Sequence, residues 1–214
     1  MILPTMTDEQ RMQELMTDFR RFYTKFVREI EPKWDKMALK QNVFPKIFRW
    51  TQVSASNNNI HIAGNIYGRK AVREGYASMM YTTMRTNKGT HLFMYTNCGE
   101  EFLYLFPPHA LLRYNDRLSL HLSDAETVDH YICRQVQSNG GGEVDEVTGK
   151  CILATDDGIW MGNRIIGNFY IFKTFVDNSL LHDNQLKEGE NCKNDYDEFI
   201  EMARKYYKQL HKSL

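Results

Sequence analysis

The stretch CILATDDGIWMGNRIIGNFYIFKTFV, residues 151–176, decides the fold class. It is one apolar run that two turns divide, Asp157-Gly158 and Gly167-Asn168, and such Gly-containing dipeptides are typical of hairpins. The sequence therefore predicts a meander of three antiparallel strands, and it favours a turn over a catalytic carboxylate pair at Asp156-Asp157. The predicted strands are Cys151–Thr155, Ile159–Ile166 and Phe169–Val176.

A second group of strands is predicted before this meander. Tyr76–Arg85 and His91–Thr96 have an apolar period near two, which is typical of strands. The turn Asn97–Glu100 then leads into Glu101–Phe106, so these segments predict a hairpin that ends at Pro107-Pro108.

Two helices are expected between the strand groups. The first covers His109–Leu118. The second begins at the capping box formed by Ser123 and Glu126 and runs to about Gln137. Residues 140–142 are three glycines without the flanking residues of a phosphate loop, so we expect a flexible loop there.

The two ends of the chain are also predicted to be helical. Apolar residues recur at intervals of three and four over Thr7–Glu31, and a second helical segment is expected over Pro32–Gln41. The polar run Ser54–Asn59 indicates a loop, and Asn194–Lys212 is amphipathic.

These elements predict an α+β fold with a mainly antiparallel sheet, N-terminal helices, two central helices and a C-terminal helix. Because no linker divides the core, we expect one domain over residues 1–214. Within it, residues 1–60 form a helical N-terminal extension and residues 76–214 the α+β core.

Composition excludes several classes of protein. The 214 residues carry 27 basic and 27 acidic side chains, so the chain lacks the net positive field of a general nucleic-acid or membrane binder, although a local basic site is allowed. No stretch is apolar enough to span a bilayer and no signal peptide is recognised at the start, so a cytoplasmic protein without a membrane partner is expected. The four cysteines are widely spaced, which favours free thiols over disulfides or a zinc site.

The sharpest chemical signal lies in the first central helix. His109, Arg113 and Arg117 are spaced by four residues, and each such step turns a helix by only about 40°, so the three form one basic stripe. A histidine can transfer protons near neutral pH and arginines bind phosphate or carboxylate, which suits phosphodiester chemistry. The alternative is a solvated face, or arginines paired with carboxylates such as Asp116 and Asp124.

Weaker candidates lie elsewhere. Lys173 stands among apolar strand residues, and in a regular strand Lys173 and Thr174 point to opposite faces, so at most one of them serves a given site. A metal cluster is not expected from the spacing of the nearby histidines and aspartates, and no dinucleotide motif or hydrolase elbow is present. We expect no cofactor and no metal. The metal candidates considered were His121, Asp124, Asp129 and His130.

The segment PHALLRYNDR, residues 108–117, followed by a helix and a meander containing FKTF, resembles the H-A-x-x-R-x-x-x-R layout of small RelE-like or barnase-like domains. Such domains occur in toxins and in proteins of phages and mobile elements. The resemblance covers about residues 109–176. It implies a compact α+β fold and, as in some members, metal-independent RNA cleavage, with His109 as the acid–base group, Arg113 and Arg117 as phosphate binders, and Lys173 as a weaker charge donor.

Two functions follow as expectations. The first is a ribonuclease-like or toxin-like domain that uses the His-Arg-Arg stripe. The second is a non-enzymatic module of a mobile element that uses the same fold to bind a nucleic acid or a protein. The stripe favours the enzyme, whereas the neutral charge and the long N-terminal helical extension favour the module, so the expected partner is RNA or a protein.

Overall fold

The computed structural model describes residues 1–97, 99–137 and 141–180. Nine strands form one sheet in the order β1-β2-β3-β4-β5-β9-β8-β7-β6, with β5 and β9 parallel and every other neighbouring pair antiparallel. The predicted α+β class with a mainly antiparallel sheet is therefore confirmed. The strands are β1 Lys46–Val53, β2 Asn59–Ile66, β3 Ala77–Thr86, β4 Gly89–Asn97, β5 Glu101–Phe106, β6 Gly141–Val144, β7 Lys150–Ala154, β8 Gly158–Ile166 and β9 Phe169–Asp177. The helices are α1 Asp8–Lys25, α2 Glu31–Leu39, α3 Ala71–Glu74, α4 Pro108–Arg117 and α5 Asp124–Gln135.

The N-terminal helical region agrees closely with the sequence prediction. α1 begins at a capping box between Thr7 and Gln10, and a π-helical turn over Phe26–Ile30 joins it to α2. Pro32 lies in the first turn of α2, where the missing N–H costs little. The two helices therefore form one bent rod.

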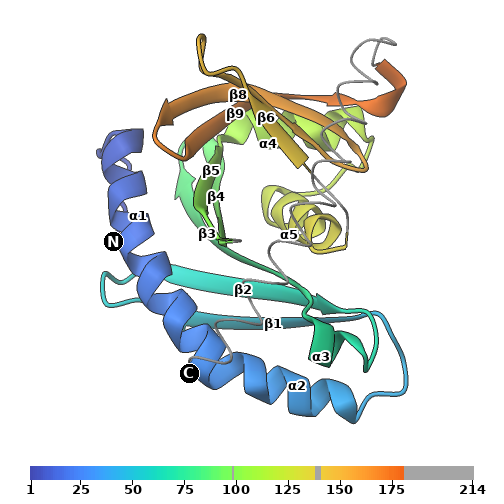
Figure 1. Cartoon of the computed structure of the whole chain (residues 1–214). Helices are drawn as coiled ribbons and strands as arrows, with labels where there is room; N and C mark the ends of the chain where they lie inside the picture. Colours follow the sequence, from blue (N-terminus) through green and yellow to red (C-terminus); the bar gives the residue numbers. More distant parts are fainter. Residues whose placement is uncertain (98, 138–140, 181–214) are drawn as a thin grey trace.

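The sheet bends around α4 and α5, and α1 and α2 lie along its outer side (Figure 1). Each face has its own apolar core. The outer core joins α1 and α2 to β1–β5 through residues such as Phe19, Trp34 and Phe93. The inner core joins α4 and α5 to β4, β5, β8 and β9 around Trp160, which is fully buried. Burying large aromatic side chains in the inner core fixes the position of α4.

The expected helical extension over residues 1–60 is wrong beyond Leu39, because residues 46–66 form the hairpin of β1 and β2. The polar run that begins at Ser54 is the turn of this hairpin. The strands escaped prediction because their partners are distant in sequence: the Phe48 ring lies 5.8 Å from Trp34 of α2, whereas Arg49 reaches α5 from the other face. β2 is buried on both faces over most of its length, so it has no apolar alternation.

The predicted meander is confirmed, since β7, β8 and β9 are consecutive antiparallel strands. The prediction of a flexible glycine loop over residues 140–142 is only partly right. Gly141 and Gly142 lie in β6, where they pair with Ala154 and Leu153, because the edge of β7 supplies hydrogen-bond partners that a free loop would lack. Residue 140 and the C-terminal helix expected over Asn194–Lys212 lie outside the described residues.

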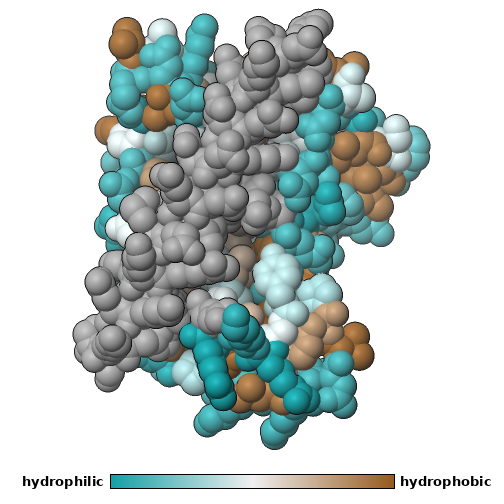
Figure 2. All heavy atoms as spheres, turned by 45° about the vertical axis from the view of Figure 1, so that its right-hand side comes forward, coloured by the Kyte–Doolittle hydropathy of each residue, from teal (hydrophilic) through white to brown (hydrophobic). Residues whose placement is uncertain are grey.

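Among the described helices, none is both long and apolar enough to cross a membrane. Figure 2 shows the described atoms of one face as brown apolar groups separated by teal polar ones. Cys133 and Cys151 are free thiols, whereas Cys98 and Cys192 lie outside the described part.

Candidate functional site

α4 carries the predicted basic stripe on its exposed face. The helix begins directly after Pro107, and Ala110, Leu111 and Tyr114 anchor it in the inner core. His109, Arg113 and Arg117 are exposed. The apolar side of α4 therefore turns the three basic residues toward solvent, as their spacing predicts.

A β-bulge in β9 lies beside this stripe. The register between β8 and β9 shifts after Met161, so Thr174 pairs with Met161 and Phe172 with Gly162. Lys173 is the extra residue between them. Phe172 and Phe175 both pack in the inner core, and neither Lys173 nor Thr174 between them belongs to that core. The expectation that these two side chains point to opposite faces assumed a regular strand, and the register shift shows that β9 is irregular here.

The bulge brings β9 into contact with the stripe. The Arg113 guanidinium donates from Nη1 to the Thr174 hydroxyl oxygen over 2.8 Å, and the Lys173 ammonium donates to Oδ1 of Asn163 over 3.3 Å. Both acceptors are neutral. Within residues 1–97, 99–137 and 141–180, no carboxylate forms an ion pair with Arg113, Arg117 or Lys173. Asp116 and Asp124 do not neutralise the stripe.

Arg117 lies near one carboxylate at the end of β9. The Asp177 pKa is below its ordinary value, mainly because Ser179 donates hydrogen bonds to it, with a smaller contribution from the charge of Arg117. Arg117 is thus partly compensated electrostatically, and Arg113 is the better placed of the two arginines for an external anion.

His109 lies in the first turn of α4. It is exposed and forms no hydrogen bond with a described residue. Its neighbour is His91 of β4, whose pKa is lowered by burial first, then by Arg11, and slightly by His109. An acid–base histidine is usually oriented by a second group, and the described residues supply none here.

Sequence reasoning missed a polar cluster around Asp157. The Tyr114 hydroxyl donates to Oδ2 of Asp157 over 2.9 Å, and the Arg134 guanidinium donates to Oδ1 over 2.6 Å. His130 Nδ1 lies 3.3 Å from the same Tyr114 hydroxyl. Burial raises the pKa of Asp157, but the bonds from Arg134 and Tyr114 outweigh it, so the pKa lies below its usual value. The cluster ties α4 and α5 to the β7–β8 turn.

The residues weighed as a metal cluster serve separate contacts. Asp129 pairs with Arg49 of β1, which also donates to the Cys133 sulfur over 2.6 Å. Asp124 binds Thr90, and His130 belongs to the Asp157 cluster. In the described part of the chain, no three His, Cys, Asp or Glu side chains are grouped to hold a metal ion.

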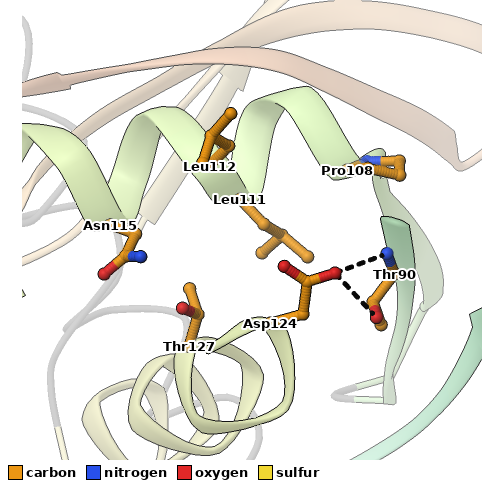
Figure 3. A pocket seen from close by; sticks show the side chains of 7 residues that line it. All are labelled: Thr90, Pro108, Leu111, Leu112, Asn115, Asp124 and Thr127. Carbon is orange, nitrogen blue, oxygen red and sulfur yellow. Dashed lines mark hydrogen bonds between the residues drawn. The ribbon is translucent and has the colours of Figure 1, made fainter. Parts of the chain in front are cut away.

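A small hollow lies between β4, α4 and the first turn of α5 (Figure 3). Asp124 points across it to Thr90, accepting from the backbone N–H over 3.2 Å and from the hydroxyl over 3.3 Å. The cavity volume is about 10 Å³, enough for about one water molecule. It therefore offers no room for a substrate. Its lining residues are Thr90, Pro108, Leu111, Leu112, Asn115, Asp124 and Thr127.

No family model, curated protein or solved structure matches this chain. The interpretation of the site therefore rests on its own geometry. The feature that this geometry singles out is the group of exposed basic side chains where α4 meets β9, namely His109, Arg113, Arg117 and Lys173, which we name the α4–β9 surface.

Proposed function

We propose that this protein binds RNA through the α4–β9 surface, by contacts with the phosphate backbone. The observation that carries the proposal is the partner of Arg113: among the described residues, its guanidinium is held by a neutral hydroxyl and by no carboxylate. A guanidinium whose charge is not consumed internally can bind a phosphate through its remaining N–H groups.

The spacing of the stripe supports a polyanion as the partner. Four residues of α-helix advance by about 6 Å, so His109, Arg113 and Arg117 form a ladder with steps of that size. This step is close to the separation of neighbouring phosphates along one nucleic-acid strand. Lys173 adds a charge beside the ladder, so binding needs only a local basic surface and is compatible with the neutral net charge.

Binding rather than cleavage is the function that this geometry supports. Metal-independent cleavage needs an acid and a base that are positioned near the scissile phosphate, because proton transfer by a side chain depends on its geometry. His109 has neither a hydrogen-bonded partner among the described residues nor a place in the small hollow beside α4. The proposal is therefore the non-enzymatic module.

A fluorescence anisotropy titration tests the proposal, with labelled single-stranded RNA of mixed sequence as the probe. Wild type should bind, and Arg113→Ala/Arg117→Ala should bind at least tenfold more weakly. Arg28→Ala is the matched control, because Arg28 is an exposed arginine on the opposite helical layer, and its affinity should equal that of wild type.

The same mixtures, incubated with and without a chelator and separated on a denaturing gel, report on cleavage. Intact RNA with a bound complex agrees with the proposed module. Loss of full-length RNA that is abolished by His109→Ala would replace the module with the ribonuclease. Wild type that does not bind RNA, or a double variant that binds as well as wild type, would refute the proposal.

A further inference from the structure

The β9 bulge requires a glycine on the facing strand. A Cβ atom on Gly162 would lie 2.0 Å from the carbonyl oxygen of Ile171, a distance that no side chain tolerates. Gly162 is thus the residue of β8 that lets β9 come close where the register shifts. Bulges of this kind often re-aim side chains at functional sites.

The consequence of the bulge is that two neighbouring residues lie outside the inner core. In a regular strand, Lys173 and Thr174 would lie on opposite faces, and one of them would enter the inner core. Here the core positions are taken by Phe172 and Phe175, and the register shift leaves both intervening residues out of that core. The Thr174 hydroxyl lies where Arg113 reaches it from α4, and Lys173 is the preceding residue of the same strand.

The Arg113–Thr174 contact fixes the direction of the guanidinium. Only Nη1 is engaged, over 2.8 Å, and no other hydrogen bond or ion pair joins Arg113 to a described residue. A free arginine side chain loses considerable rotamer entropy on binding, and holding it in place beforehand reduces that loss. The remaining N–H groups stay available for an anion.

We infer that the bulge forms a binding site for one phosphate group of the bound RNA. In this phosphate site, Arg113 and Lys173 bind the phosphate oxygens and Thr174 is a positioning residue for Arg113. This inference rests on the proposed function and goes beyond it, because it assigns a role to an uncharged residue. It separates charge from orientation: Arg113 and Lys173 supply charge, whereas Thr174 supplies only direction.

The test uses the full chain, the same labelled RNA, and two readouts, the dissociation constant and its dependence on salt. Thr174→Val keeps the shape and β-branching but removes the hydroxyl, so affinity should fall about threefold to tenfold, as for one lost hydrogen bond. Its salt slope should not change, since no phosphate contact of a charged group is removed. Thr174→Ser keeps the hydroxyl and should restore wild-type affinity. Lys173→Gln should weaken binding and reduce the salt slope by about 0.7.

Two results would refute the phosphate site and leave the proposed function standing. One is Thr174→Val binding like wild type while Arg113→Ala binds weakly. The other is equal loss of affinity in Thr174→Val and Thr174→Ser together with a lower melting temperature, which would make Thr174 structural. If Arg113→Ala/Arg117→Ala also binds like wild type, the proposed function itself fails, so the two failures are distinguishable.

Discussion

The position of α4 depends on the carboxylate of Asp157, and removing that carboxylate should destabilise the fold measurably. Tyr114 has no exposed surface, and its hydroxyl donates to Asp157 over 2.9 Å. The Asp157 side chain is only 13% exposed, whereas that of Arg134 is 41% exposed. The Tyr114 contact is therefore the less exposed of the two, and the Arg134 contact is partly screened by water.

These geometries give the size of the effect. Tyr114→Phe removes one hydrogen bond to a charged acceptor, which lowers the free energy of unfolding by about 1.5 kcal/mol. Asp157→Ala removes the acceptor of both donors and leaves the Tyr114 hydroxyl with His130 as its nearest alternative, so about 3 kcal/mol is expected. The double variant should also lose about 3 kcal/mol, because the shared bond is counted once, which gives a coupling energy of about 1.5 kcal/mol.

Urea unfolding of the four proteins measures this cycle, and the melting temperature of Asp157→Ala should fall by roughly 6–12 °C. Asp116→Ala is the matched control, because Asp116 is an exposed carboxylate of the same helix, and its stability should stay within about 0.5 kcal/mol of wild type. Additive losses in the double variant, or a stable Asp157→Ala protein, would show that Asp157 does not hold α4 in place.

Three further predictions concern stability. The Asp157 pKa is lower in the folded than in the unfolded protein, so the contribution of Asp157 to stability is present above the ordinary aspartate pKa of about 3.9 and is lost as pH falls through the folded value. The wild-type melting temperature should therefore drop more steeply below about pH 5 than that of Asp157→Asn. Parallel curves for the two proteins would contradict this. Gly162→Ala should lower the free energy of unfolding, measured by thermal unfolding, by about 2–3 kcal/mol, because the added Cβ meets the backbone of β9. Gly68→Ala should be tolerated, because no atom lies within 4 Å of its added Cβ. Equal stability of the two variants would refute the bulge argument. Asp18→Ala should lower the free energy of unfolding by about 2–4 kcal/mol, since the buried Asp18 carboxylate accepts hydrogen bonds from Ser54, Ser56 and Asn58. Hydrogen exchange should then accelerate over residues 54–58, and unchanged exchange would count against this anchoring role.

Much of the fold could be predicted because its signals are local. The β7–β9 meander is divided by Asp157-Gly158 and Gly167-Asn168, and the stripe of α4 follows from helical spacing within ten residues. β1 and β2 were missed because their stability comes from α2 on one face and α5 on the other, contacts that a reading of neighbouring residues does not contain.

The candidate site was predictable only in part, for the same reason. His109, Arg113 and Arg117 lie in one helix, so their common exposure followed from the sequence. The side on which Thr174 meets Arg113 depends on a register shift against Gly162, which only the paired strands reveal. The Asp157 cluster joins three segments, and its one sequence signal, an Asp-Gly turn, indicates a turn and not the partners of its side chain.

The salt dependence of RNA binding tests the central claim most directly. Each phosphate contact with single-stranded RNA contributes about 0.7 to the slope of log affinity against log salt concentration. The slope of Arg113→Ala/Arg117→Ala should therefore be smaller than that of wild type by about 1.4, whereas Arg28→Ala should keep the wild-type slope. Equal slopes for wild type and the double variant would show that the α4–β9 surface does not contact the phosphate backbone.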